Sequence, residues 1–253
     1  MRVLITGATS GIGYEFASLY AKEKNNLILV ARDTNKLQNI KLNFEKKYSV
    51  KVDVIALDLS LVNSSQKLIS YLDDKKIDIL INNAGIGDYG EFINNDIEKI
   101  TSMINLNITT LTELTHYFTK LMVKNGGGKI LNIASTASFQ PVPTFAVYSA
   151  TKAYVLNFSE AINHELKNKG VYVGTLCPGP TSTNFDKNAN ATHIKHLTSG
   201  AMSSKEVAKA GIKQLQNNQM TLIVGFKNKL LAFASDMNPF RKLALKISAN
   251  IMK

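Results

Sequence analysis

Short apolar runs alternate with longer amphipathic stretches along most of the chain. Runs such as residues 27–31 are apolar at every position, as expected for parallel strands that are covered on both faces. The stretch 11–24 instead places Ile12, Phe16 and Leu19 on one side at helical spacing. This pattern predicts strands at 2–6, 27–31, 51–56, 77–81, 129–134, 171–176 and 220–224. It predicts helices at 11–24, 34–48, 60–72, 96–123, 147–167 and 204–216.

The repeated strand–helix units predict an α/β fold with a doubly wound, mostly parallel sheet of seven strands. No composition break, linker or internal repeat divides the first 225 residues. We therefore expect a single domain over residues 1–225. A basic amphipathic helical extension, residues 226–253, is expected to pack on or near it.

The composition is that of an ordinary soluble globular protein, with 45% hydrophobic and 19% charged residues. Cys177 is the sole cysteine, so an intrachain disulfide is excluded, which fits a reducing compartment. The first residues enter an apolar strand without the regions of a signal peptide. No run reaches the ~18 apolar residues of a membrane span. These features predict a cytoplasmic protein.

The extension carries much of the net charge of +11, with basic residues at 227, 229, 241, 242, 246 and 253 against Asp236 alone. No zinc spacing, recognition helix or ribonucleoprotein motif accompanies the charge, so we do not expect nucleic-acid binding. Apolar groups at 230–234 and 243–247 are interleaved with the basic residues. Three interpretations are open: packing on the protein's own surface, a contact between subunits, or peripheral attachment to an anionic membrane. Membrane attachment would suggest a lipophilic substrate.

A glycine-rich turn, TGATSGIG at residues 6–13, lies between the first strand and the first helix. Glycines at such a junction permit a tight turn and let the backbone approach a pyrophosphate. The helix that begins near Gly11 offers free N–H groups and its positive dipole end to the same anion. The turn therefore indicates a dinucleotide site.

Tyr148 and Lys152 are expected on one helix, where positions i and i+4 share a face. A lysine ammonium near a phenol favours the phenolate and lowers a pKa that is otherwise about 10. A tyrosine tuned in this way exchanges a proton with an alcohol or carbonyl oxygen near neutral pH. The pair indicates an acid/base site, although the same spacing also arises by chance on helix surfaces.

Five motifs occur together: the glycine turn, the NNAG run at 82–85, Ser135, Tyr148-x-x-x-Lys152 and Pro178-Gly179. In order and spacing they resemble the short-chain dehydrogenases/reductases over about residues 1–225. The resemblance implies a Rossmann fold and hydride transfer between a nicotinamide cofactor and a carbonyl or alcohol substrate, with reduction as the favoured direction.

The resemblance also implies a catalytic tetrad. Tyr148 would be the general acid/base, and Ser135 would orient the substrate oxygen. Lys152 would lower the Tyr148 pKa and bind the nicotinamide ribose. The fourth member is Asn107 rather than Asn105, because its distance from Ser135 matches the family more closely. It would anchor a water that continues the proton path.

Cofactor type depends on Ala31, Arg32 and Asp33 at the end of the second strand. NAD-selective relatives place an acid where Ala31 lies, whereas the arginine that follows resembles NADP-preferring relatives and pairs well with a 2′-phosphate. Asp33 lies at the generic distance from Gly13 for a ribose-binding acid, but it could equally cap the following helix. The sequence favours NADP(H) over NAD(H).

Further cofactor contacts are implied by the resemblance at the ends of several strands and on the Tyr148 helix. They are Gly7, Thr9, Ser10, Gly11, Ile12, Gly13, Arg32, Asp58, Leu59, Asn83, Ala84, Gly85, Tyr148, Lys152, Pro178, Gly179, Thr181 and Thr183.

The substrate pocket is expected between residues 139–145 and the loop 185–202, whose apolar residues predict an apolar wall without naming a substrate. His193 and His196 in that loop lack a Cys or carboxylate cluster, so we expect no metal site.

The leading interpretation is an NADP(H)-dependent carbonyl reductase or alcohol dehydrogenase. The alternatives are a 3-oxoacyl-thioester reductase that meets an acidic acyl carrier protein and a non-catalytic NADP-binding regulatory protein. Short-chain dehydrogenases/reductases are often homodimers or homotetramers, so the resemblance implies a homodimer or homotetramer here as well.

Overall fold

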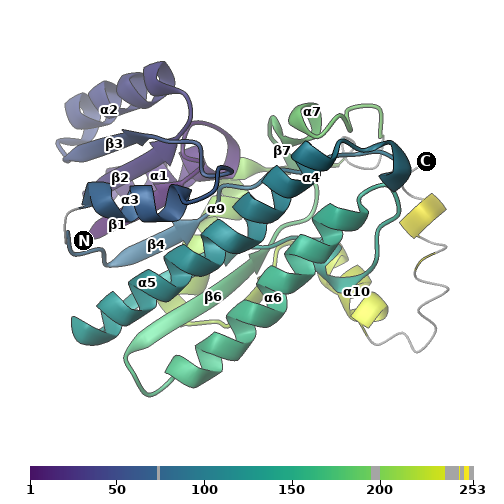
Figure 1. Cartoon of the computed structure of the whole chain (residues 1–253). Helices are drawn as coiled ribbons and strands as arrows, with labels where there is room; N and C mark the ends of the chain where they lie inside the picture. The colour runs from purple at the N-terminus through teal and green to yellow at the C-terminus, as the bar shows by residue number, and fades with distance from the viewer. Residues whose placement is uncertain (73–74, 195–199, 237–244, 246–247, 251–253) are drawn as a thin grey trace.

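The computed structural model describes residues 1–72, 75–194, 200–236, 245 and 248–250. Within these residues, the centre is a parallel seven-stranded sheet in the order β3-β2-β1-β4-β5-β6-β9 (Figure 1). The order reverses between β1 and β4, and ligands of open α/β sheets bind at such switch points. The strands are β1 (Arg2–Thr6), β2 (Asn26–Ala31), β3 (Val52–Ala56), β4 (Ile79–Asn82), β5 (Gly128–Ile133), β6 (Val171–Cys177) and β9 (Thr221–Ile223).

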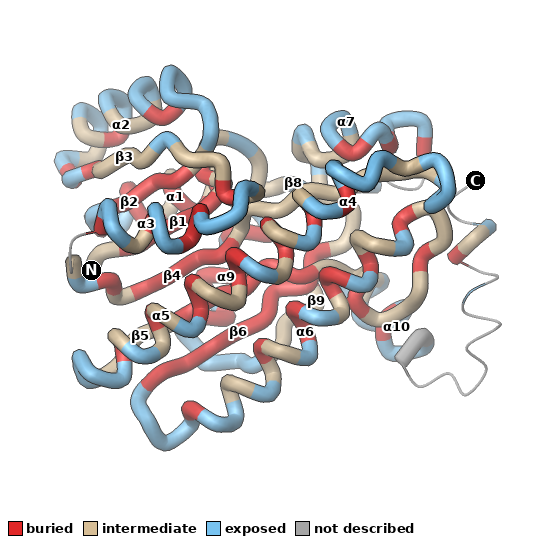
Figure 2. The backbone as a smooth tube through the Cα atoms, in the orientation of Figure 1, coloured by how far each residue is buried: buried red, intermediate tan, exposed pale blue. Residues whose placement is uncertain are grey.

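Helices cover both faces of this sheet (Figure 1). One face is covered by α1 (Gly11–Lys22), α2 (Thr34–Tyr48) and α9 (Ser204–Asn217). The other is covered by α3 (Ser64–Leu72), α5 (Leu111–Lys124) and α6 (Ala146–Leu166). Successive strand residues point to opposite faces, so Val3 and Ile5 pack beside α1 while Leu4 packs beside α5. The sheet is accordingly the buried centre of Figure 2, and the predicted doubly wound, single-domain α/β fold is confirmed.

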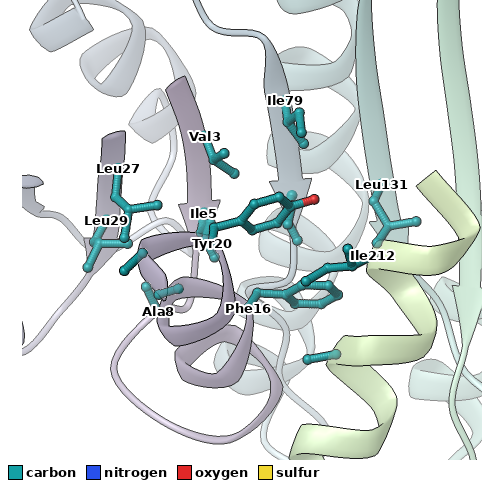
Figure 3. Close-up of a cluster of buried hydrophobic side chains, with 14 of the residues drawn as sticks. Val3, Ile5, Ala8, Phe16, Tyr20, Leu27, Leu29, Ile79, Leu131 and Ile212 are labelled. Carbon is teal, nitrogen blue, oxygen red and sulfur yellow. The ribbon is translucent and has the colours of Figure 1, made fainter. Parts of the chain in front are cut away.

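The core beneath α1 and α9 holds the first helix in place. Figure 3 shows Phe16 of α1 beside Ile212 of α9, both packed under the sheet residues Ile5 and Leu131. Gly211 permits this close approach, because a Cβ at this position would lie 2.6 Å from Cζ of Phe16. As a result, the N-terminus of α1 is fixed at the carboxyl end of β1.

The helix predicted at 96–123 is divided into three segments. α4 (Ile97–Ile104) and α5 are joined by a π-helical turn, Asn105–Thr110. Such turns inside helices are frequent at functional sites, and this one carries Asn107. The other predicted elements are present, most of them with shifted ends. α3, for example, begins at Ser64 rather than at residue 60.

Several short elements were not predicted. Two 3₁₀ turns cover Phe92–Asn94 and Thr136–Phe139. The segment expected to be a loop after β6 contains β7 (Thr181–Ser182), α7 (Phe185–Asn188) and β8 (Met202–Ser203), with β7 and β8 paired in parallel. Elements this short leave no periodic signal in the sequence.

The described part of the extension lies against the domain. α10 (Phe226–Asp236) follows Gly225, which adopts φ of +91° and turns the chain after β9. Further along, Oγ of Ser248 donates a 2.8 Å hydrogen bond to the carbonyl oxygen of Pro141. Apart from Leu245, the predicted apolar group at 243–247 lies outside the described residues. No helix in the described ranges is both long and apolar enough to traverse a bilayer.

Candidate active site

A cavity of about 830 Å³ lies at the carboxyl ends of β1, β2, β4, β5 and β6. Since β2 and β6 stand on either side of the switch point, the cavity runs across most of the sheet. Eighteen predicted site residues line it: Gly7, Thr9, Ser10, Gly11, Ile12, Arg32, Asp58, Leu59, Asn83, Ala84, Gly85, Ser135, Tyr148, Lys152, Pro178, Gly179, Thr181 and Thr183. The remaining two, Gly13 and Asn107, lie behind this wall.

The glycine turn is closed by a side chain from the neighbouring strand end. Gly7 and Gly11 adopt φ of +66° and +55°, which glycine accepts without strain. Nδ2 of Asn83 donates to the carbonyl oxygens of Thr6 at 2.9 Å and of Gly7 at 3.2 Å. Gly13 serves packing, because a Cβ there would lie 2.3 Å from the carbonyl oxygen of Gly7. The turn therefore presents the N-terminus of α1 to the cavity, the arrangement that suits a pyrophosphate.

Tyr148 and Ser135 meet in the cavity wall. Tyr148 comes from α6, and Ser135 follows β5, where its Oγ accepts a 3.1 Å hydrogen bond from the backbone N–H of Ala137. Burial raises the pKa of Tyr148 to about 12, although a hydrogen bond with Ser135 lowers it in part. This direction is opposite to the one expected from the Tyr–Lys spacing, because loss of solvent has the largest effect on the phenol. Tyr148 is therefore protonated at neutral pH.

Lys152 lies on the same face of α6, as its spacing predicted, and is only 5% exposed. Its Nζ is 5.8 Å from the centre of the Tyr148 ring and donates a 2.8 Å hydrogen bond to the carbonyl oxygen of Ile133. Burial lowers the pKa of Lys152 to about 8, so the ammonium form still predominates at pH 7. The acid/base pair thus consists of a neutral phenol and a buried cation.

Asn107 positions backbone next to this pair. Its Nδ2 donates to the carbonyl oxygen of Ile86 at 2.9 Å and to Oγ1 of Thr151 at 3.0 Å, and its Oδ1 accepts from the N–H of Ile86 at 3.1 Å. A Cβ on Gly85 would lie 3.3 Å from both Oδ1 of Asn107 and Nζ of Lys152. The asparagine chosen by spacing is therefore beside the lysine, with its side chain committed to protein partners.

Arg32 and Asp33 lie at the same strand end but have separate partners. Oδ1 of Asp33 accepts from the backbone N–H of Lys36 at 3.0 Å and caps α2, and this hydrogen bond lowers the pKa of Asp33. Of the two alternatives for Asp33, the structure contains the helix cap. The exposed Arg32 lines the cavity, with its Nη1 3.9 Å from Oδ2 of Asp58.

Aromatic side chains surround Tyr148. The centre of its ring is 5.6 Å from that of Phe145 and 5.2 Å from that of Phe185. Gly87 makes room for them, because a Cβ there would lie 2.7 Å from Cζ of Phe185. Val142 belongs to the same apolar cluster. The predicted apolar wall is therefore present on both sides of Tyr148.

The extension supplies five cavity residues that were not predicted: Asn228, Leu231, Ala232, Ala234 and Ser248. Nδ2 of Asn228 donates to the carbonyl oxygen of Val224 at 2.7 Å. A Cβ on Gly179 would lie 2.3 Å from the same nitrogen, so the amide rests directly on the loop after β6. An isolated asparagine in a basic helix was visible in the sequence, but its distant glycine partner was not.

Of the two histidines in the predicted loop, the structure describes His193. The ring of His193 packs against Tyr89, with 4.8 Å between ring centres, and His196 lies outside the described residues. Among the residues that the structure describes, no three His, Cys, Asp or Glu side chains are gathered as ligands would be.

The chain is similar to known proteins over most of its length. A family model described as short chain dehydrogenase matches residues 1–194. The chain belongs to the short-chain dehydrogenase/reductase family. Its members are oxidoreductases that use a nicotinamide cofactor, and a small-molecule substrate follows from that chemistry.

Three similar proteins illustrate the relationship. The very-long-chain 3-oxoacyl-CoA reductase of Rattus norvegicus is 33% identical over 217 residues, which are 83% of this chain and 67% of the rat protein. The ketoacyl reductase HetN of Nostoc sp. is 34% identical over 227 residues, 88% of this chain and 77% of that protein. A short-chain dehydrogenase from Sphingobium yanoikuyae, solved in complex with NADPH, has a TM-score of 0.83 and 31% identity, covering 94% of this chain and 97% of that one.

Proposed function

We propose that this short-chain dehydrogenase/reductase uses NADPH to reduce the 3-oxo group of lipophilic acyl thioesters. The observation that carries the proposal is the composition of one continuous cavity. Arg32 lies at the end of β2, Tyr148 and Lys152 lie together in its wall, and apolar side chains extend from Phe145 to Leu231. The same cavity thus combines a cation for the cofactor phosphate, an acid/base pair for the carbonyl group and an apolar surface for the acyl chain.

Tyr148 is suited to donate a proton to a carbonyl oxygen. With a pKa of about 12, it keeps the proton on its Oη at neutral pH. When bound, NADPH supplies the hydride that converts the carbonyl carbon to an alcohol carbon. The alkoxide that develops is a stronger base than a phenolate, so proton transfer from Oη is favourable. Ser135, which shares a hydrogen bond with Tyr148, is placed to donate to the same oxygen and stabilise its charge.

Lys152 supports the same direction of reaction. At pH 7 it is predominantly an ammonium, and its Nζ lies within 5.8 Å of the Tyr148 ring centre. A cation at this distance stabilises the phenolate that remains after the proton has left. Reduction is therefore the direction that the resting protonation states favour.

Arg32 supports NADP(H) rather than NAD(H). Within the described residues, its guanidinium forms a loose, exposed ion pair with Asp58 at 3.9 Å, which binds it weakly. A ribose 2′-phosphate offers bidentate, charge-assisted hydrogen bonds in its place. The carboxylate of Asp33, which would otherwise suit a 2′-hydroxyl, is engaged in the cap of α2. The Sphingobium relative, whose structure contains NADPH, agrees with this choice.

The experiment that tests the proposal measures NADPH oxidation with 3-oxoacyl-CoA substrates of increasing chain length, beside simple ketones and aldehydes. Each methylene buried in the apolar wall contributes about 0.8 kcal/mol, so kcat/KM should rise about fourfold per added CH₂ until the wall is filled. Equal turnover of small ketones and long thioesters would contradict the assigned substrate class. A folded protein that binds NADPH but reduces none of them would instead be a regulatory NADP-binding protein.

A further inference from the structure

α10 carries four exposed large apolar side chains, and one of them, Leu231, lines the cavity. The other three, Phe226, Leu230 and Phe233, are here called the apolar ridge. Their exposed fractions are 82%, 61% and 63%. The spacing i, i+4, i+7 places them along a single face of the helix. Single exposed apolar residues are common, but a row of three on one helix indicates a contact surface.

The opposite face attaches α10 to the domain. Ala232 is only 4% exposed, and the Asn228 amide is fixed by Val224 at 2.7 Å and rests against Gly179. At 100° per residue, these two positions lie across the helix axis from the apolar ridge. The ridge therefore points away from the domain, and a small rotation of α10 cannot bury it.

Two exposed lysines, Lys227 and Lys229, border the apolar ridge, one on each side of it. Lysine stems lie along apolar surface while their ammonium groups reach outward. An apolar helix face bordered by lysines is typical of helices that lie in the headgroup region of a membrane. A second copy of the chain is a poorer occupant, because two facing ridges would bring their lysines together.

We infer that α10 docks this protein on anionic membranes, with the apolar ridge in the acyl boundary and Lys227 and Lys229 at the headgroups. A consequence, which rests on the proposed function, concerns substrate entry. Leu231 and Ala234 of the same helix line the cavity. A lipophilic acyl chain can therefore pass from the bilayer along α10 toward Tyr148 without crossing bulk water.

The test uses the full chain in sedimentation with phosphatidylcholine vesicles, with and without phosphatidylglycerol. The variant Phe226→Ser/Leu230→Ser/Phe233→Ser should lose tenfold or more of its binding to anionic vesicles. Lys227→Gln/Lys229→Gln should lose about tenfold or more and show a weaker salt dependence. The matched control is Leu42→Ser/Leu61→Ser/Val62→Ser, which removes exposed apolar residues far from α10 and should bind as wild type does.

A second readout is independent of sedimentation. The chain has no tryptophan, so Phe226→Trp places a single indole on the apolar ridge. Its emission should shift to shorter wavelength when anionic vesicles are added, and it should not shift with phosphatidylcholine alone. An unshifted spectrum in the folded variant would overturn the inference, as would equal vesicle binding by wild type and the ridge variant.

The remaining outcomes separate this inference from its alternatives. The ridge is instead a contact between copies of the chain if wild type is oligomeric, the ridge variant is monomeric, and the two proteins do not differ in vesicle binding. Reduction of a short, soluble 3-oxoacyl thioester without vesicles should be unaffected in the ridge variant. A wild-type protein without any reductase activity would contradict the proposed function. The vesicle result would still show whether α10 binds membranes.

Discussion

Asn107 and Ile86 pair through both ends of a side-chain amide: Nδ2 donates to the Ile86 carbonyl oxygen at 2.9 Å, and Oδ1 accepts from its N–H at 3.1 Å. Asn107 lies in the π-helical turn Asn105–Thr110 between α4 and α5, and its side chain is completely buried. The pair fixes the backbone segment after β4 that contains Gly85 and Ile86. This segment lies beside Lys152, because a Cβ on Gly85 would lie 3.3 Å from Nζ of Lys152. Asn107 thus acts on the acid/base pair by positioning its surroundings.

Replacing Asn107 should therefore impair both stability and turnover. Asn107→Ala leaves two partly buried backbone groups of Ile86 without this partner, which costs about 2 kcal/mol of unfolding free energy. We expect kcat to fall at least tenfold, because Lys152 loses its fixed neighbour. Urea denaturation and steady-state kinetics check both effects. Asn105→Ala, in the same turn but outside this pairing, is the control, and an equal loss in both variants would contradict the assigned role.

Tyr148→Phe tests the proton donor. The variant keeps the ring that packs on Phe145 and Phe185 but has no proton to give. We expect kcat to fall by about 10²–10⁴-fold. NADPH binding, measured by fluorescence titration, should remain near the wild-type value. Tyr154→Phe on the same helix removes an exposed hydroxyl bonded to Thr112 and should leave turnover intact. Substantial activity in Tyr148→Phe would assign the proton to another group.

Arg32→Ala tests the preference for NADPH. Loss of a charge-assisted contact with the 2′-phosphate should raise the Michaelis constant for NADPH about 10- to 100-fold. The constant for NADH should change little, since NADH has no phosphate at this position. Kinetics with both cofactors provide the internal control. An unchanged Michaelis constant for NADPH would show that Arg32 does not select the cofactor.

Substitution of Asp33 tests whether this residue caps α2 or binds the cofactor ribose. Asp33→Ala removes the acceptor for the N–H of Lys36 and should lower the melting temperature. Asp33→Asn keeps an acceptor and should retain the wild-type melting temperature. Neither change should raise the Michaelis constant for NADPH or NADH, which steady-state kinetics can determine. Weaker NADH binding in both variants would restore the ribose-binding interpretation.

Burial of Lys152 predicts that the protein gains stability between neutral and alkaline pH. Its pKa falls from the ordinary value of 10.5 to about 8, so in this window the unfolded chain binds the extra proton and the unfolding free energy rises with pH. From pH 7 to pH 9.5, this group should contribute about 2 kcal/mol. The measurement is urea denaturation of wild type and Lys152→Met at both pH values. The wild type should gain about that much relative to the variant, and a constant difference would show that Lys152 has an ordinary pKa.

The sequence alone was sufficient for the architecture, because the signals that specify it are local. Continuous apolar runs identified strands covered on both faces. The predicted helix at 34–48 matches α2 to the residue, because Asp33 caps its start and Ser49, in the left-handed region at φ of 54°, ends it. Motif spacing also identified 18 of the residues that line the cavity, since parallel strands end at one edge of the sheet.

Only the tertiary structure decided the properties that depend on segments distant in the chain. The upward shift of the Tyr148 pKa follows from burial among side chains such as Phe145 and Phe185, so the spacing of Lys152 could not reveal its sign. The place of α10 at the cavity depends on the contact of Asn228 with Gly179, which no local pattern encodes. Sequence periodicity reports which face of an element is apolar. Packing determines what that face meets, and therefore the charge state of the site and the surface left for partners.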